Sequence, residues 1–445
     1  MVLKMILFIM ISRDTLYLSQ EDAVKLALEN NLILKSSRSR VTASKYGIKE
    51  ARSAFFPEVS LQAGYRRVSL VQEMKSFILD SLVMTPGGAF IPVGHYESIP
   101  FGKEDNYSLS FNVSQPLFTW GNIIRGYKIS LLNFKNKLIE DSVTRESLIK
   151  NVKELYIYAL IAKEYYDLTL FIDEELRKHY ESAKKKFENG SATELELLQA
   201  EVEYKTHKPK IEEAKKNYEN ILDLLKINLG IDTSQTIVLK DSLEGEIPKS
   251  LPEFCVEKRL DLKSLELQME MLKLQKNIFK SSNLPSLFAG FNYLYQRPFG
   301  FIDEWKGYWV LNLGLSFPIF DGFKNISKAR EIEANLKSLK YMYKFNSLSA
   351  YNSYMTAKRD YEIALKNLTA AKENLKLARK LYEMAKVQYE EGLISELDFI
   401  DAETSYFAQK VNYLNSLGTL EIKWLQLEAQ VKGINNPQFN KEGGF

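Results

Sequence analysis

Several residue types that would point to a function are scarce in this chain of 445 residues. One cysteine, Cys255, allows neither an intrachain disulfide nor a cysteine-based metal cluster. The three histidines, His95, His179 and His207, lie far apart and lack metal-ligand spacing. No apolar run approaches about 18 residues, which excludes a multi-helix membrane protein. Basic and acidic residues nearly balance, 60 against 57, so the composition does not predict a nucleic-acid partner.

Proline and glycine are missing from two long spans. No proline occurs at 117–208 or 319–436, and no glycine occurs at 127–189 or 323–391. Because proline costs roughly 3 kcal/mol inside a helix, each span can form one helix roughly 100 Å long. Helices of that length are typical of coiled coils rather than of compact domains.

Residues at alternating spacings of four and three support this prediction in both spans, as a heptad repeat requires. The first series is Ala162, Tyr166, Thr169, Asp173, Leu176, Tyr180, Ala183 and Phe187, with Asp173 as the one misfit. The second series is Ala364, Leu368, Ala371, Leu375, Ala378, Tyr382, Ala385 and Tyr389.

The two halves of the chain resemble each other. Residues 188–201, ENGSATELELLQAE, match residues 390–403, EEGLISELDFIDAE, at an offset of 202. The same offset relates QPLF at 115–118 to FPIF at 317–320. Each half is therefore predicted to contain a helix, a strand, a loop, a strand, a very long helix, a turn and a helix, which indicates gene duplication of a large unit.

The first half also holds additional residues. PEVSLQAGY at 57–65 resembles PSLFAGFNY at 285–293 at an offset of 228, which leaves 26 extra residues in the first half. They fall within 68–104, where MTPGG, IPVG and IPFG predict a long loop.

Four short segments alternate apolar with small or polar residues, the period of a β-strand with one apolar face. The apolar positions are Val59, Leu61, Ala63 and Tyr65; Tyr107, Leu109, Phe111 and Val113; Leu287, Ala289, Phe291, Tyr293 and Tyr295; and Trp309, Leu311, Leu313, Leu315 and Phe317. A half-buried sheet in a soluble sandwich is the usual explanation, but two separated hairpins supply no second sheet to cover so aromatic a face. Strands of about ten residues with aromatic ends instead match a transmembrane β-barrel. Because lipid tolerates no open sheet edge and such barrels need at least about eight strands, the barrel must be shared between chains.

The order of these elements is similar to that of the TolC-like outer-membrane efflux protein family, the outer membrane factors. The resemblance rests on the segment at 18–65, QPLFTWGN at 115–122, FPIFDGF at 317–323 and two E-x-G turns, and it covers about residues 18–435. It implies a mainly α fold with a membrane β-barrel portion. In that fold a homotrimer joins four β-strands per chain into a twelve-stranded barrel, and its very long coiled-coil helices form an α-helical periplasmic tunnel.

The resemblance also implies a function: a passive outer-membrane channel of a tripartite efflux or type I secretion system. Its expected partners are two further copies of the chain, a periplasmic adaptor (membrane fusion) protein, an inner-membrane transporter and outer-membrane lipid. No cofactor and no metal are expected. An alternative is a periplasmic coiled-coil adaptor or scaffold without a pore, although adaptors have one coiled-coil hairpin flanked by β-rich domains. The chain has no phosphate loop, dinucleotide fingerprint or nucleophile elbow, so an enzyme is not expected.

The expected organisation is two repeats between terminal segments. Residues 1–18 contain MILFIMI after a lysine and are expected to be a signal peptide or an N-terminal extension, and 436–445 form a C-terminal tail. The first repeat, 19–240, is expected to hold a helix, strands at 58–67 and 106–117, a long helix at 121–188 and a helix at 193–229 that Pro209 should kink. The second, 241–435, is expected to hold a helix at 253–282, strands at 286–296 and 308–318, a long helix at 323–390 and a helix at 395–432.

The turns between the paired helices contain the candidate functional residues. Gly190 and Gly392 follow the long helices and are expected to have a left-handed backbone, with Thr193 and Ser395 as the next N-caps. Asp398 and Asp401 are three residues apart, so both project from one helix face.

The family resemblance assigns roles to residues near these turns. Asp398 and Asp401 match aspartates that line the periplasmic aperture, where six carboxylates in a trimer would favour cations. Glu196 stands where the family has an acidic gate residue, and Tyr389 matches a tyrosine that links neighbouring helices. Ile394 replaces an expected arginine, which puts the family's gate-locking ion pair in doubt. The alternative is that these aspartates are ordinary solvated charges. Separately, the expected lipid-facing aromatic residues are Tyr65, Tyr107, Phe111, Trp309 and Phe317.

Overall fold

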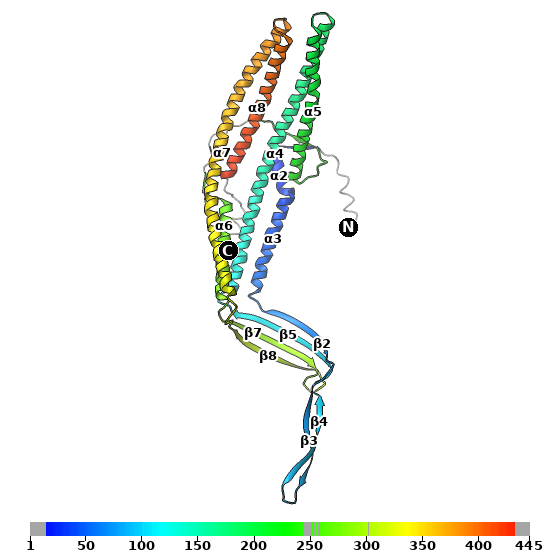
Figure 1. Cartoon of the computed structure of the whole chain (residues 1–445), viewed down its shortest axis with the longest axis vertical. Coiled ribbons are helices and arrows are strands. Elements are labelled where there is room, and N and C mark those ends of the chain that lie inside the picture. The colour runs from blue at the N-terminus through cyan, green and yellow to red at the C-terminus, as the bar shows by residue number, and fades with distance from the viewer. Residues whose placement is uncertain are drawn as a thin grey trace. The chain divides into compact units, whose positions relative to one another are not determined.

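The computed structural model describes residues 15–100, 102–243, 251, 254–256, 259–300 and 302–431, and the chain divides into two compact units (Figure 1). Unit 1 holds the described residues of Met1–Ala43, Phe134–Gln268 and Ser338–Phe445, and unit 2 holds Ser44–Asn133 and Met269–Lys337. Most of the expected N-terminal segment at 1–18 and the whole tail at 436–445 lie outside the described residues.

Two pairs of helices with equal lengths make up most of the chain. Helices α4 (Asn122–Glu188) and α7 (Lys324–Glu390) have 67 residues each, and α5 (Glu194–Leu229) and α8 (Glu396–Val431) have 36 each. The bounds of α4 and α5 recur in α7 and α8 at an offset of 202 residues. The internal repeat and the mainly helical fold are therefore confirmed. Pro209 lies inside α5, and the helix continues on both sides of it.

Two further helices have 22 residues each. They are α3 (Leu32–Ser53) and α6 (Leu260–Ser281). Helix α6 begins seven residues after the start expected for the helix at 253–282.

The heptad residues of the long helices form a seam of small buried side chains. Ala364, Ala371, Ala378 and Ala385 of α7 are all buried, as the spacing predicts. Asp173, the misfit of the first series, lies 3.8 Å from Nδ1 of the buried His207 on α5. At this heptad position a carboxylate therefore faces an imidazole, in place of the apolar contact that a heptad repeat usually forms.

The main core of unit 1 surrounds a short parallel pair of strands, β1 (Leu16–Leu18) and β6 (Ile237–Leu239). Helix α2 (Gln20–Asn30) and the middle of α4 pack on this core. Tyr156 of α4 is fully buried, and its hydroxyl donates a hydrogen bond of 2.8 Å to the carbonyl oxygen of Leu18. Burial raises the pKa of the Tyr156 hydroxyl, so the group stays protonated and keeps this bond.

Unit 2 contains one four-stranded antiparallel sheet. Its strands are β2 (Glu58–Arg67), β5 (Asp105–Phe118), β7 (Ser286–Arg297) and β8 (Lys306–Ser316), in the order β2-β5-β7-β8 (Figure 1). The two halves of the chain meet where β5 pairs with β7. The four strands expected per chain are therefore confirmed, and β2 and β8 stand at the edges of this sheet.

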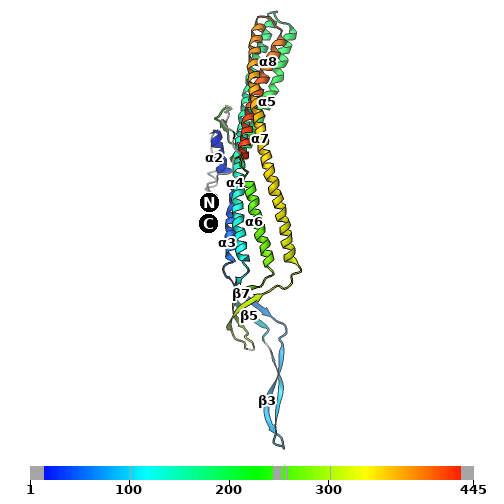
Figure 2. The same cartoon turned by 90° about the vertical axis from the view of Figure 1, so that its left-hand side faces the viewer.

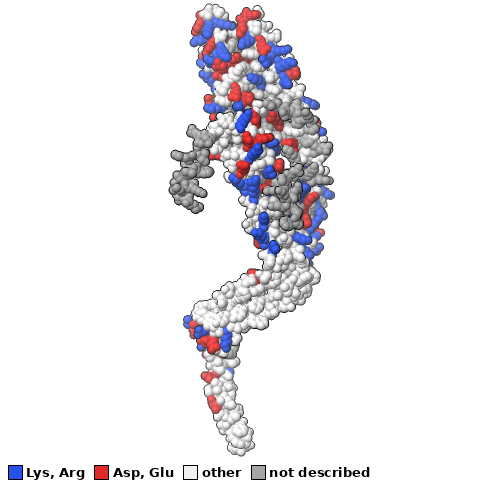
Figure 3. Space-filling model, turned by 180° about the vertical axis from the view of Figure 1, so that it is seen from behind, with Lys and Arg blue, Asp and Glu red and all other residues white. Residues whose placement is uncertain are grey.

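Aromatic side chains cluster on this sheet. The rings of Tyr65 and Tyr107, directly opposite each other on β2 and β5, lie 5.2 Å apart, and Trp305 lies 6.0 Å from Tyr107. Trp309 of β8 stacks on Phe291 of β7 at 6.4 Å. On the face that Figure 3 draws, charged side chains gather over the helices, and the surface of the four-stranded sheet shows very few.

Within the part of the chain that the structure describes, no helix combines the length and apolar character needed to cross a membrane.

The prediction of a long loop at 68–104 is wrong, because most of these residues form a two-stranded antiparallel ribbon. Strands β3 (Glu73–Met84) and β4 (Phe90–Pro100) pair with each other and with no other strand of the described chain (Figure 2). The turn-forming residues within 85–89 make only the tip, where Thr85 and Ala89 exchange hydrogen bonds and Gly88 has φ +84°. Turn residues thus marked a hairpin and not an unstructured loop.

A pair of glycines tests how tightly the core of unit 1 is packed. Gly230 and Gly190 have similar left-handed φ values, +70° and +75°, but a Cβ on Gly230 would lie 2.6 Å from the carbonyl oxygen of Asn30, whereas Gly190 faces open space. We expect G190A to cost only the left-handed strain, about 1–2 kcal/mol. G230A should cost clearly more, because α2 must also move. Thermal unfolding of the detergent-solubilised protein measures both, and equal losses would contradict this packing.

Candidate functional site at the helix tips

Both long helices end in the same kind of turn. Gly190 and Gly392 have φ +75° and +76°, the left-handed backbone expected of each. The amide of Gly190 donates to the carbonyl of Phe187 at 2.9 Å, and that of Gly392 donates to the carbonyl of Tyr389 at 3.1 Å. The amide of the next residue donates to the carbonyl one residue farther back, Ser191 to Lys186 and Leu393 to Gln388, which completes a Schellman motif.

Two of the expected gate residues hold the N-termini of the following helices. The Glu196 carboxylate accepts a 2.6 Å hydrogen bond from the backbone amide of Thr193, whose hydroxyl in turn accepts from the amide of Glu196. Asp398 and Ser395 form the same reciprocal arrangement, with 2.6 Å between the Ser395 hydroxyl and Oδ2 of Asp398. These are capping boxes. Asp401 is exposed one turn farther along α8.

Tyr389 contacts three other tip residues from two helices. Its ring stacks on Phe399 of α8 at 5.0 Å and lies 5.6 Å from the ring of His179 on α4. Lys186 of α4 places its Nζ 3.9 Å from the centre of the Tyr389 ring, a cation–π contact. Burial raises the pKa of the Tyr389 hydroxyl. Ile394 packs on the same cluster, so the residue that replaces the expected arginine adds an apolar contact there.

A buried histidine–glutamate contact joins α4 to α8 beside this tyrosine. Nε2 of His179 contacts Oε1 of Glu396, and their side chains are only 9% and 2% exposed. The other carboxyl oxygen of Glu396 is buried without a hydrogen-bond partner. Sequence reasoning missed this pair. A signal was present, because Glu396 and Glu403 share one helical face with the buried Phe399.

A second buried acid, Glu403, lies about two turns after Glu396 on α8. Burial, with help from nearby Glu175 and Glu203, raises the pKa of Glu403 to about 7 against the lowering effects of His179 and Lys386. A cavity of about 260 Å³ is lined by Glu175, His179, Ser182, Tyr382, Lys386, Tyr389 and Glu403, together with neighbouring residues of the same helices. Ionisable groups from α4, α7 and α8 therefore converge just below the tips.

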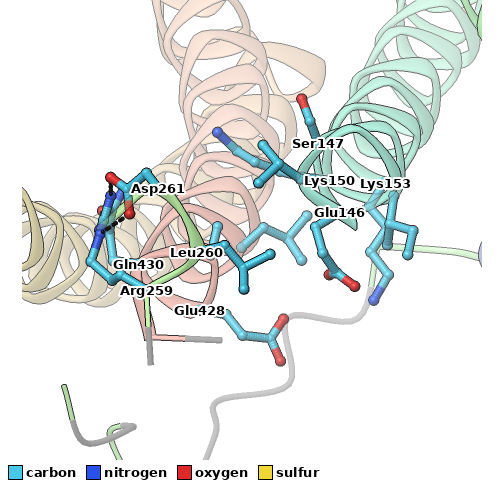
Figure 4. Close-up of a pocket in the computed structure, with 13 residues that line it drawn as sticks. Glu146, Ser147, Lys150, Lys153, Arg259, Leu260, Asp261, Glu428 and Gln430 are labelled. Atoms are coloured by element: carbon cyan, nitrogen blue, oxygen red, sulfur yellow. Dashed lines mark hydrogen bonds and ion pairs between the residues drawn. The ribbon is translucent and has the colours of Figure 1, made fainter. Parts of the chain in front are cut away.

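A larger cavity, about 470 Å³, lies between α4, the start of α6 and the end of α8 (Figure 4). Acidic and basic side chains are mixed on its wall, and Arg259 is already paired with Asp261 at 3.0 Å. Among the residues that the structure describes, no group of three or more His, Cys, Asp or Glu side chains is arranged to hold a metal ion.

Removing His179 should weaken the tip strongly. H179L leaves the buried carboxyl of Glu396 without a partner, which typically costs about 3–5 kcal/mol. The double variant H179L/E396L replaces the pair by apolar side chains and should recover most of the loss. Hydrogen exchange of tip peptides measures both variants, and an equal loss in the single and double variants would show that the pair contributes nothing specific.

Glu403 should make the tip sensitive to pH. Its pKa in the folded chain, about 7, lies above the ordinary value of 4.5, so the folded state holds the proton more tightly than the unfolded state. Stability should therefore fall as pH rises through this interval and lose roughly 3 kcal/mol in total by about pH 8. E403Q should abolish the trend in hydrogen exchange of the tip after correction for intrinsic rates. The exposed-residue variant E391Q serves as the control, and a trend that survives E403Q would exclude Glu403 as its source.

Comparison with solved structures shows what the fold is similar to. The Campylobacter jejuni CmeC outer membrane channel is 19% identical with a TM-score of 0.78, over 95% of this chain and 88% of that chain. The outer membrane protein VceC of Vibrio cholerae is 14% identical with a TM-score of 0.71, over 92% and 95%. The open state of the Neisseria gonorrhoeae MtrE outer membrane channel is 15% identical with a TM-score of 0.73, over 92% and 88%. At such identities the likeness shows the fold alone.

Comparison of sequences shows the family. No curated protein sequence matches the chain. Residues 23–230 and 251–431, however, match the family model described as outer membrane efflux protein. The match spans both repeats and confirms the expected location in the outer membrane, with the long helices in the periplasm. The chain belongs to the outer membrane efflux protein family.

Proposed function

We propose that three copies of this chain form a passive exit channel of a tripartite efflux or type I secretion system. The observation that carries the proposal is the four-stranded sheet with open edges at β2 and β8. Unpaired backbone groups are not tolerated in lipid, so β2 of one copy must pair with β8 of the next. Three copies close a ring of twelve strands, and no chain can form the barrel alone.

The aromatic residues of the sheet support a lipid-facing exterior. Trp309 and Phe317 are 65% and 56% exposed in the single chain, and Tyr65, Tyr107 and Phe111 are 59%, 41% and 39% exposed. Aromatic rings of this kind form the girdles of membrane barrels. We assign all five to the lipid-facing surface.

Apolar side chains on the helices support contacts with other copies and with an adaptor. Leu377, Met384 and Val387 of α7 are more than half exposed, which suits burial against a neighbouring copy in a helical tunnel. At the turns, Leu195 and Leu393 are 66% and 67% exposed. We assign this end to docking of a periplasmic adaptor that joins the channel to an inner-membrane transporter.

The tip residues support a narrow, gated aperture. Around a threefold axis, the exposed Asp401 side chains would form a ring of negative charge. Asp398 lies three residues before Asp401, nearer to the loop that joins α7 to α8. Tyr389 and the packing of Ile394 would hold the closed state, because Ile394 stands where the arginine of the family's ion pair was expected. Glu196 would act mainly through its capping box.

Single-channel recording in lipid bilayers tests both the trimeric channel and the aperture formed by Asp401. The purified trimer should conduct ions and prefer cations, and D401N should lower cation preference and weaken block by divalent cations, with little loss of stability. D398N is the matched comparison, since it should also lose the cap, about 1 kcal/mol. A stable pore-forming monomer would contradict the shared barrel. A D401N channel with unchanged selectivity and block would refute the aperture alone.

A further inference from the structure

The ribbon of β3 and β4 has no partner within its own chain. Apart from each other, the two strands have no substantial contact with any helix or strand of the described residues. The second repeat lacks the corresponding 26 residues. An isolated two-stranded hairpin is marginally stable in water, so this ribbon needs a surface to pack against.

The register of the ribbon sorts its side chains onto two faces. One face carries Glu73, Lys75 and Ser98 at the end that joins β2 and β5, and only apolar side chains and Gly94 from there to the tip. This outer part, here called the apolar ribbon face, holds Phe77, Leu79, Leu82, Met84, Phe90 and Tyr96. All six are 44–71% exposed in the single chain. The opposite face alternates polar and apolar pairs: Ser76, Ser81, His95 and Glu97 lie among Met74, Ile78, Val83, Ile91, Val93 and Ile99. From the Phe77–Tyr96 pair to the tip, one side of the ribbon therefore has no polar side chain, whereas the other side is polar at its middle.

A bulge at Asp80 makes the apolar face continuous. The register shifts between Leu79 and Ser81, so Leu79 opposite Gly94 and Leu82 opposite Pro92 lie on the same face although they are three residues apart. The Asp80 carboxylate contacts Nδ1 of His95 at 2.9 Å, which anchors the bulge.

An aromatic pair reinforces the same face. The ring of Phe77 lies against Gly94, where a Cβ would be 2.8 Å from its Cζ, and it meets the Tyr96 ring at 5.3 Å. Such details indicate a surface built for contact rather than a disordered loop.

Lipid is a poor occupant for this face. Both edges of the ribbon leave backbone N–H and C=O groups unpaired, and membrane interiors do not tolerate such edges. The polar face would also bring Asp80, His95 and Glu97 into lipid. The occupant must cover the apolar face and leave the edges and the polar face in water.

The position of the ribbon in the chain favours other copies as the occupant. Strand β2 follows a helix and β5 leads into one, so the ribbon joins the strand ends that lie away from the helices. The pairing of β2 and β5 continues through the Val68 amide to the Glu104 carbonyl at 2.8 Å, and Arg67 contacts Glu104 at 2.9 Å. In the proposed trimer, three ribbons therefore rise at one level around the axis.

We propose that the apolar ribbon faces of three copies pack against one another around the threefold axis and narrow the outward-facing mouth of the channel. This inference rests on the proposed trimer. It assigns the additional 26 residues of the first repeat to a contact between copies, outside the barrel.

Adjacent residues on opposite faces provide a matched test. In a C255S background, oxidation of L82C should link up to two of every three chains as disulfide dimers, because the Leu82 side chains converge near the axis. S81C projects from the other face and should leave the chains unlinked. A trimer in which L82C fails to link, or in which S81C links equally, would overturn the ribbon contact.

Separate measurements distinguish the failure of the ribbon contact from the failure of the trimer. The mass of the particle in detergent reports the trimer directly, and a monomer would overturn the proposed function itself. Quenching of L82W fluorescence by brominated lipid would show that lipid covers the face and would refute the proposal.

Shortening the ribbon tests the narrowed mouth. Residues 69–103 are replaced by the shorter connection of the second repeat, residues 298–305, which joins β7 to β8. The variant should remain trimeric and show a higher single-channel conductance than the full chain. Unchanged conductance in an intact trimer would refute narrowing of the mouth.

Discussion

An open edge of a β-sheet presents backbone groups that only another strand can satisfy in lipid, and most features of this chain depend on that constraint. Four strands give one chain two open edges, so the barrel belongs to an assembly and not to a chain. Duplication of a helix–hairpin–helix unit supplies those strands in two equivalent parts that meet at β5 and β7. The long helices follow directly from β5 and β8 in each copy, so strand pairing also sets which helices become neighbours.

The helices obtain close contact from small residues and specificity from a few buried polar ones. The buried alanines of α7 let a neighbouring helix approach closely. Small apolar side chains alone, however, would allow one helix to shift along the other. All three histidines of the chain lie within 4 Å of a carboxylate: His95 beside Asp80, His179 beside Glu396 and His207 beside Asp173. Each pair stands where a particular geometry is needed, at a bulge, at a tip and in a heptad seam. The His95–Asp80 pair is exposed, whereas the pairs of His179 and His207 are largely buried and can favour one alignment of the helices over another.

The parts that sequence reasoning predicted are those that local patterns encode. Proline and glycine mark the ends of α4 and α7, and alternation of period two marks the four barrel strands. The ribbon was missed because the bulge at Asp80 interrupts that period between Leu79 and Leu82. The pair of His179 and Glu396 joins residues 217 positions apart, which spacing cannot reveal. The capping boxes of Glu196 and Asp398 were visible as T-x-x-E and S-x-x-D, although the resemblance drew attention to a gate role instead.

The duplication did not copy the buried pair at the tip. At the offset of 202 residues His179 corresponds to Leu381 and Glu396 to Glu194, and the side chains of Leu381 and Glu194 are exposed in the single chain. A ring of six hairpins built from three chains then has two kinds of joint in alternation. The contact between the two hairpins of one chain contains the buried pair of His179 and Glu396, whereas the equivalent positions, Leu381 and Glu194, would supply no such pair to the contact between chains. A force that spreads the ring would therefore open the three contacts between chains first, and the two helical hairpins of each chain would stay together at their tips.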